Sequence, residues 1–273
     1  MSPNLKQNRI EERFQTLKKE GKKAFIPYIM CGDPSLEKTA QLVKLLEECG
    51  ADAIELGVPF SDPLADGPVI QAAGLRALNA GVNLRVVIEF VKKVRTEKFT
   101  DVPLILMTYF NPVFRYGEDA FILDARAAGV DGVIIPDLPV EEGDSMAKSA
   151  GRQGLDVIFL AAPTSGDERL KKVARASNGF IYFVSITGIT GAKLEISEEL
   201  RSSLAKLEGP AQAGQKNQKP VVVGFGIRTP GEAGMVSALA DGVVIGSAIV
   251  KAAAESSDAE LKEYLLALRA AIK

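Results

Sequence analysis

Short apolar runs alternate with amphipathic segments along the chain from residue 24 to the C-terminal end. Within each run the apolar residues do not alternate with polar ones, which is typical of strands buried on both faces of a parallel sheet. Glycine, proline and acidic residues bound most of the runs, as expected at strand ends. The predicted strands cover residues 24–30, 53–57, 103–109, 132–137, 156–162, 180–185, 220–226 and 241–246.

Between these runs, apolar residues recur at helical spacing. We expect Ser35 to cap the helix that follows it, and Ser165 or Asp167 to cap the helix over 167–177. The stretch 208–219 is polar without an apolar period and is predicted to be a solvated loop. The predicted helices cover 4–20, 35–49, 69–80, 84–97, 117–128, 140–153, 167–177, 197–207 and 230–239, followed by a helical turn from 247 and a final helix from about 258.

Eight strand–helix units match the count and the length, about 250 residues, of a (β/α)8 barrel. A doubly wound open sheet is the main alternative, but such sheets usually have fewer strands and less even spacing. No shift in composition marks a domain boundary. We therefore predict an α/β fold, a single (β/α)8 TIM barrel over residues 1–273, with an extra N-terminal helix within 1–20 that packs on the barrel.

Composition excludes several classes of function. The net charge is −2 and the acids and bases are interspersed, which gives no support for binding to nucleic acid or to a membrane surface. The chain contains no histidine, so Ser–His and Cys–His nucleophile pairs and most transition-metal sites are excluded. Cys31 and Cys49 form no metal-binding pattern and are interpreted as reduced thiols of a cytoplasmic protein. No apolar run has the length of a membrane span, and the N-terminus does not resemble a signal peptide.

The most distinctive segment is ELGVPFSDPLADGP, residues 55–68, at the end of a predicted strand. It places Glu55, Asp62 and Asp66 in or beside a proline-rich loop. An acid within an apolar strand is costly to bury unless another group pairs with it or the protein uses it. A rigid loop at the end of a strand suits acid–base chemistry, because its geometry is fixed before the substrate arrives. The alternative is a structural turn whose aspartates cap the following helix.

Further candidates follow the other strands, where the carboxyl ends of a barrel build the active site. Glycines after the last two strands leave backbone N–H groups open to an anion, and Ser247 begins a helix whose N-terminus favours phosphate. The alternative is that these glycines serve only tight turns between strand and helix. The glycine-rich segment 186–193 is interpreted as a lid, with a surface loop as the alternative. The remaining candidates are Tyr109, Asn111, Asp137 and Tyr182 near strand ends, Gly226 and Gly246 for phosphate, and Tyr28, Ile70, Met107 and Phe225 for an apolar pocket wall.

Distinctive motifs lie in seven segments, 27–34, 55–68, 109–117, 136–142, 186–192, 223–227 and 246–251. Together these segments resemble the α-subunit of tryptophan synthase. The resemblance runs from about residue 20 to the end of the chain and implies a single barrel. It also implies retro-aldol cleavage of indole-3-glycerol phosphate to indole and D-glyceraldehyde 3-phosphate, in tryptophan biosynthesis and without a cofactor.

The resemblance also implies roles for individual residues. Glu55 falls on the acid–base residue of the family, Asp66 on the aspartate that hydrogen-bonds the indole N–H, and Tyr182 on a tyrosine near the reacting centre. Thr190 falls on the threonine that orders the closed lid. One departure is Ile186, where some members carry an arginine that takes part in lid contacts. The implied phosphate-binding residues are Gly191, Gly226, Gly246 and Ser247.

The family's usual partner is the pyridoxal-phosphate-dependent β-subunit, in an α2β2 complex, and the resemblance implies contacts at 112–117 and 136–142. Three alternatives stay open. The chain is a stand-alone lyase that releases free indole, a catalytically silent subunit that activates its partner, or another phosphosugar barrel enzyme. The last alternative does not account for the acidic loop, and a Schiff-base aldolase would require a buried strand lysine that the sequence lacks.

Overall fold

The computed structural model describes residues 8–184, 198–208, 219–224 and 226–273. Within these residues the strands form one parallel sheet in the order β5-β4-β3-β2-β1-β9-β8-β7-β6. The confirmed architecture is therefore that of an α/β barrel. The strands are β1 (Ala24–Met30), β2 (Ile54–Gly57), β3 (Leu104–Met107), β4 (Gly132–Ile134), β5 (Asp156–Ile158), β6 (Leu160–Ala161), β7 (Ile181–Val184), β8 (Val221–Gly224) and β9 (Gly242–Ile245).

The barrel closes through a single stretch of chain. β5 pairs with β4 and β6 pairs with β7, so the two outer strands of the sheet are consecutive in sequence. Only Phe159 separates them, and its carbonyl accepts a hydrogen bond of 3.3 Å from the Tyr182 amide. The predicted strand 156–162 is therefore divided in two, because its two halves pair with opposite edges of the sheet.

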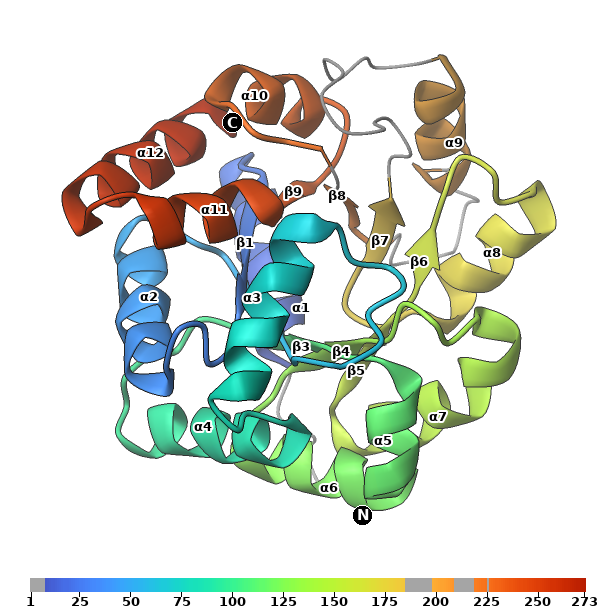
Figure 1. Cartoon of the computed structure of the whole chain (residues 1–273). Helices are drawn as coiled ribbons and strands as arrows, with labels where there is room; N and C mark the ends of the chain where they lie inside the picture. The colour runs from blue at the N-terminus through green and yellow to red at the C-terminus, as the bar shows by residue number, and fades with distance from the viewer. Residues whose placement is uncertain (1–7, 185–197, 209–218, 225) are drawn as a thin grey trace.

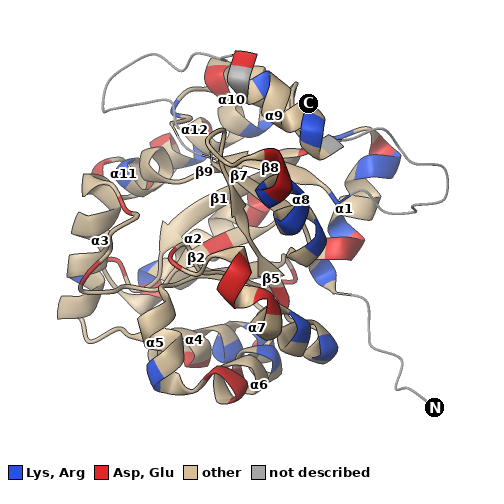
Figure 2. Cartoon of the chain, turned by 90° about the vertical axis from the view of Figure 1, so that its right-hand side faces the viewer, with Lys and Arg blue, Asp and Glu red and all other residues tan. Residues whose placement is uncertain are grey.

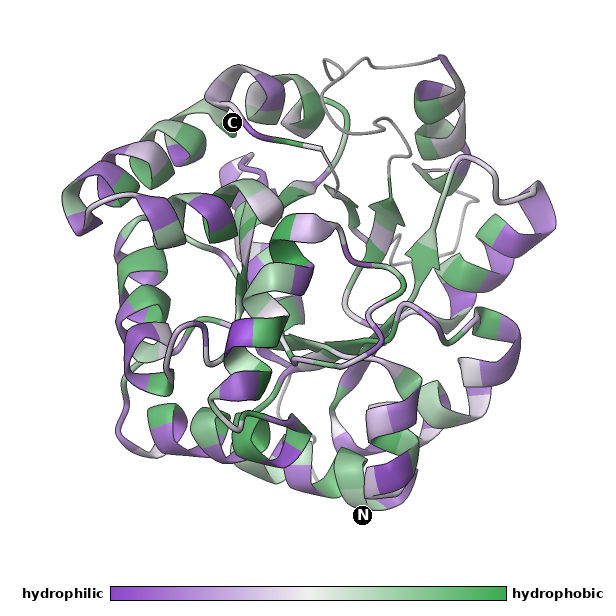
Figure 3. Cartoon of the chain, in the orientation of Figure 1, coloured by the Kyte–Doolittle hydropathy of each residue, from purple (hydrophilic) through white to green (hydrophobic). Residues whose placement is uncertain are grey.

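Helices surround the strands, as Figure 1 shows, and follow most strands in the expected alternation. Figure 3 shows that the strands are largely hydrophobic, whereas the helices are mixed. In Figure 2, charged residues of both signs are scattered over the helices. The helices are α1 (Arg9–Glu20), α2 (Leu36–Glu48), α3 (Pro68–Asn79), α4 (Leu84–Thr96), α5 (Phe110–Tyr116), α6 (Glu118–Ala128), α7 (Val140–Gln153), α8 (Asp167–Ala176), α9 (Glu198–Glu208), α10 (Pro230–Ser237), α11 (Ser247–Glu255) and α12 (Asp258–Ala271).

One local prediction is wrong, and one helix was not predicted. The helix is α5, and Pro112 lies in its first turn, where the missing N–H of proline is not needed. The wrong prediction concerns α8, whose N-cap is Gly166, and no side chain caps this helix. Ser165 instead accepts a hydrogen bond from the Ala162 amide at 3.2 Å. The cap prediction for Ser35 is confirmed, since its side chain accepts from the Lys38 amide.

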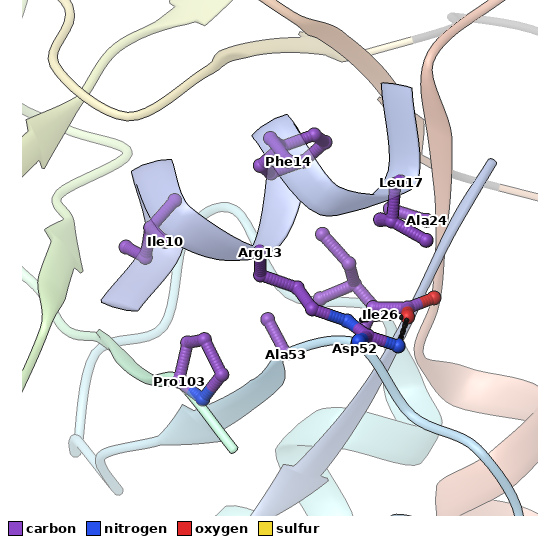
Figure 4. Close-up of a pocket in the computed structure, with 9 residues that line it drawn as sticks. All are labelled: Ile10, Arg13, Phe14, Leu17, Ala24, Ile26, Asp52, Ala53 and Pro103. Atoms are coloured by element: carbon purple, nitrogen blue, oxygen red, sulfur yellow. Dashed lines mark hydrogen bonds and ion pairs between the residues drawn. The ribbon is translucent and has the colours of Figure 1, made fainter. Parts of the chain in front are cut away.

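Helix α1 covers the amino ends of the strands, opposite the expected active site. Its buried side chains Ile10, Phe14 and Leu17 face the starts of β1 and β2 (Figure 4). Arg13 on the same helix donates from Nε to Asp52 Oδ1 at 2.9 Å. One amphipathic helix thereby seals this end of the barrel with both apolar contacts and an ion pair.

Candidate active site

The candidate acid Glu55 lies within the barrel wall. It is the second residue of β2, and its register partners are Tyr28 on β1 and Ile105 on β3. Side chains of a strand alternate between its two faces, so register partners in a parallel ladder share a face. Glu55 and Tyr28 therefore point to the same side of the sheet, near the carboxyl ends of the strands.

The environment of Glu55 favours a protonated carboxyl group. The residue is 1% exposed, and among the described residues neither carboxyl oxygen has a hydrogen-bond partner. Burial, with a smaller contribution from the charge of Asp66, raises the pKa of Glu55 to about 8. A carboxyl group with a pKa near the working pH can both give and take a proton.

Asp66 lies on the connection between β2 and α3. Partial burial raises the pKa of its carboxyl group, and a hydrogen bond with the Tyr109 side chain opposes that rise. The interpretation of this loop as a helix cap is wrong. The N-cap of α3 is Gly67, and no side chain caps it. Asp62 instead accepts a hydrogen bond from the hydroxyl of Ser61. The carboxylates of this loop are therefore not used to hold α3.

Two buried tyrosines complete the centre of the site. Tyr28 and Tyr182 are each 5% exposed, and burial raises the pKa of both phenols. The charge of Glu55 raises both pKa values further, and that of Asp66 also acts on Tyr28. Both phenols therefore remain protonated at neutral pH and can donate a hydrogen bond to a substrate oxygen.

The predicted phosphate residues are described in part. Gly246 is the N-cap of α11 and Ser247 is the first residue of that helix, so backbone N–H groups at its N-terminus are open to an anion. A Cβ on Gly246 would lie 3.6 Å from Cβ of Tyr28, which places this helix end beside the tyrosine. Gly226 is exposed and has a φ of 80°, which favours glycine. Thr190, Gly191 and Phe225 lie outside the described residues.

The described pocket-wall candidates belong to the core or pack against it. Ile70 is buried in the first turn of α3, and Met107 ends β3 packed against the core. Tyr109 is buried beside the acidic loop and bonds to it, a role that the sequence prediction missed. Asp137 was noted only for its position, but its carboxylate accepts from the Phe110 amide at 2.8 Å and so holds the start of α5. A backbone amide has no side-chain signature, so neither bond could be found from residue types.

The described residues contain neither a metal-binding cluster nor a membrane-spanning helix. No group of three or more acids and cysteines there could hold a metal ion. No helix there is both long and apolar enough to cross a bilayer.

A (β/α)8 barrel with a buried acid and two protonated phenols at the carboxyl ends of its strands defines an acid–base enzyme. The model of the tryptophan synthase alpha chain family matches residues 14–271, and the chain belongs to that family. It is therefore a carbon–carbon lyase of the alpha reaction.

Relatives and solved structures agree over nearly the whole length. The tryptophan synthase alpha chain of Geotalea uraniireducens (strain Rf4) is 49% identical over 266 residues, which is 97% of each chain. That of Picosynechococcus sp. is 48% identical and covers 96% of this chain and 98% of the relative. Tryptophan synthase subunit alpha from Legionella pneumophila str. Paris has a TM-score of 0.85 at 39% identity, covering 97% and 98%. A chain of Mycobacterium tuberculosis tryptophan synthase has a TM-score of 0.86 at 36% identity, covering 98% and 99%.

Proposed function

We propose that Glu55 is the acid and base that cleaves indole-3-glycerol phosphate to indole and D-glyceraldehyde 3-phosphate in this chain. The proposal is supported by a buried carboxyl group whose two oxygens have no hydrogen-bond partner in the part of the chain that the structure describes, and whose pKa is raised to about 8. Such a group is protonated before the reaction and, once ionised, becomes a base strong enough to take the proton back.

The cleavage takes two proton transfers, and Glu55 carries out both. Glu55 gives its proton to C3 of the indole ring, and the ring becomes a cation with positive charge at N1. Asp66, as a carboxylate, accepts a hydrogen bond from the N1–H group and stabilises that charge. The Glu55 carboxylate then takes the proton of the glycerol hydroxyl nearest the ring. The carbon–carbon bond breaks, its electron pair returns to the ring, and the glycerol fragment leaves as the aldehyde.

Tyr182 and the apolar wall orient the substrate in this proposal. The Tyr182 phenol donates to a glycerol oxygen, and Tyr28, Ile70, Met107, Tyr109 and Phe225 line the space for the indole ring. The phosphate binds at the N-terminus of α11, where the helix dipole and open N–H groups favour an anion. In this proposal the phosphate is bound by Gly191, Gly226, Gly246 and Ser247, and the role of Thr190 is in a lid.

We propose that the partner is a pyridoxal-phosphate-dependent tryptophan synthase β-subunit, in an α2β2 complex in the cytoplasm. Two solved neighbours are described as tryptophan synthase of M. tuberculosis in its aminoacrylate-bound form and in its open form with BRD0059 bound. In this chain Leu64 is 94% exposed and Phe114 is 65% exposed, on the two connections that follow β2 and β3. If the two side chains form one apolar patch, that patch would support a protein–protein contact at this end of the barrel. We also propose that residues 1–273 form one domain, which carries both the site and this surface.

The experiment is an assay of indole release from indole-3-glycerol phosphate by the purified chain, with and without a β-subunit. We expect weak release from the chain alone and a strong increase with the partner. High activity that is indifferent to the partner would instead identify a stand-alone lyase. Absence of release in both cases would contradict the proposed reaction and leave a silent activating subunit.

A further inference from the structure

Tyr109 joins the acidic loop to the barrel wall. It follows β3, is 4% exposed, and is the N-cap residue of α5. Its ring stacks on Phe60 with a centroid separation of 5.2 Å and an interplanar angle of 30°. Its hydroxyl accepts a hydrogen bond from the Ala65 amide at 3.0 Å. Phe60 and Ala65 lie near opposite ends of the same loop, so one side chain holds both parts.

The loop's own backbone bonds fold it locally but do not dock it. The Leu64 amide bonds to Asp62 at 2.9 Å and the Asp66 amide bonds to Pro63 at 3.1 Å, both within the loop. The loop is joined to β3 at its start, where the Val58 amide bonds to Met107 at 2.8 Å. The stack on Phe60 and the bond to Ala65 then extend this attachment along the loop.

The same hydroxyl can serve two neighbouring residues. A phenol has one proton to donate and lone pairs to accept, so it can accept from Ala65 and donate to Asp66 at the same time. Asp66 directly follows Ala65, and its carboxyl group is close enough to the Tyr109 phenol for that phenol to lower the pKa of Asp66. A donor to a carboxylate favours the ionised form, which is the form that must receive the indole N–H.

We propose that Tyr109 is a positioning residue, whose hydroxyl fixes the Asp66 carboxylate to receive the indole N–H by bonding to that carboxylate and to the Ala65 amide. The inference rests on the proposed role of Asp66. It assigns Tyr109 a polar function beyond that of a pocket wall. Loss of the hydroxyl would leave the ring stack but release the carboxylate.

The test is Tyr109→Phe in the full chain, assayed for indole release across pH. We expect kcat/KM to fall about tenfold, the effect of one hydrogen bond to a charged group. The acidic limb of the pH profile should also move to higher pH, because the pKa of Asp66 rises when its donor is lost. The substrate phosphate titrates in the same way for both proteins, so it does not contribute to that shift. A merely structural role would not move this limb.

Thr108→Val is the matched control. It also removes one hydroxyl group, from the preceding residue, but that hydroxyl is buried without a hydrogen-bond partner among the described residues. We expect unchanged kinetics and an unchanged pH profile. Thermal unfolding of both variants checks that each one folds.

Asp66→Asn and the double variant that combines it with Tyr109→Phe distinguish a failure of the role of Asp66 from a failure of the role of Tyr109. The inference predicts that Asp66→Asn loses activity and that adding Tyr109→Phe costs little more, because both remove one interaction. If Asp66→Asn is inactive but Tyr109→Phe matches the parent in rate and pH profile, Tyr109 does not position Asp66, and the role of Asp66 stands. If Asp66→Asn keeps full activity, the role of Asp66 fails and this inference fails with it.

Discussion

The hydroxyl oxygen of Tyr28 occupies the space in which a side chain on Gly57 would begin, since a Cβ there would lie 2.0 Å from it. Gly57 is two residues after Glu55 on β2, and so shares its face. On the other side of the barrel, a Cβ on Gly224 would lie 2.4 Å from the Tyr182 hydroxyl. The two buried phenols thus depend on glycines of neighbouring strands for the room they occupy.

We expect Gly57→Ala to displace the Tyr28 ring and to lower both activity and stability. The cost of overpacking at a rigid site is about 1–3 kcal/mol. Urea unfolding and kcat/KM measure the two effects. Gly231→Ala in α10 is the control, because a Cβ there meets no atom within 4 Å and should be neutral or slightly stabilising. Equal behaviour of the two variants would contradict the packing argument.

A second prediction concerns Asp156, at the amino end of β5. Its Oδ2 is buried without a hydrogen-bond partner among the described residues. Burial, then the charges of Asp131 and Glu11, raise its pKa to about 7, opposed by Arg126 and Lys219. A raised acid pKa means that the folded state prefers the neutral form. Stability is therefore complete below the unfolded pKa and is lost as pH rises through about 7.

Replacing Asp156 with asparagine removes the loss of stability that accompanies its ionisation. We expect Asp156→Asn to raise the free energy of unfolding by about 4 kcal/mol at pH 8 and to have little effect near pH 4. Asp101→Asn is the control, since this aspartate is exposed in the loop before β3. A gain of the same size at pH 4 and pH 8 would show that ionisation of Asp156 is not the cause.

A third prediction concerns the buried guanidinium of Arg95. It donates to Asp131 Oδ2 at 2.9 Å and to the carbonyl oxygens of Thr100, Val102 and Gly129 at 2.7, 2.8 and 3.2 Å. Its side chain is 9% exposed and that of Asp131 is fully buried. Arg95→Met leaves an acid and three carbonyls short of a donor, so we expect a loss of about 3 kcal/mol in urea unfolding.

Arg9 offers a matched comparison, because it pairs with the same Asp131 carboxylate at 2.9 Å from a position that is 37% exposed. Arg9→Met should cost about 1 kcal/mol or less, since solvent screens the pair. Losses of similar size for the two variants would show that burial does not decide the strength of these ion pairs.

A fourth prediction concerns the exposed phenyl ring of Phe114. If α5 contacts the partner, Phe114→Ser should weaken activation by a β-subunit about tenfold, measured as the β-subunit concentration at half-maximal activity. Leu266→Ser is the control, because Leu266 is a similarly exposed apolar residue on α12. A partner affinity unchanged by Phe114→Ser would place the contact elsewhere.

The sequence predicted the strands and helices of the barrel well, because the patterns that mark them are local. Apolar runs without alternation identified each strand, and glycines such as Gly21 and Gly129 marked helix ends that the structure confirms. The same local rules missed helix α5, which contains Pro112 in its first turn, a position where proline is tolerated.

Other features depend on register and on long-range contacts, which no local pattern contains. The sequence predicted Glu55 as a buried acid, but not that Tyr28 is its register partner. It placed Tyr109 beside the site, but not its bond to the Ala65 amide, because every residue offers such an amide. Asp66 was weighed as a helix cap, and only the path of the chain shows that Gly67 takes that position.

The most direct test of the account is the pH dependence of indole release by the parent chain and by Glu55→Gln, together with binding of a phosphate-bearing substrate analogue to both. We expect the variant to bind the analogue normally and to lose nearly all turnover. In the parent, kcat/KM should fall as pH rises through about 8, where Glu55 loses its proton. Substantial turnover by Glu55→Gln, or a parent profile with no alkaline limb near that pH, would contradict the assignment of Glu55 as the acid and base.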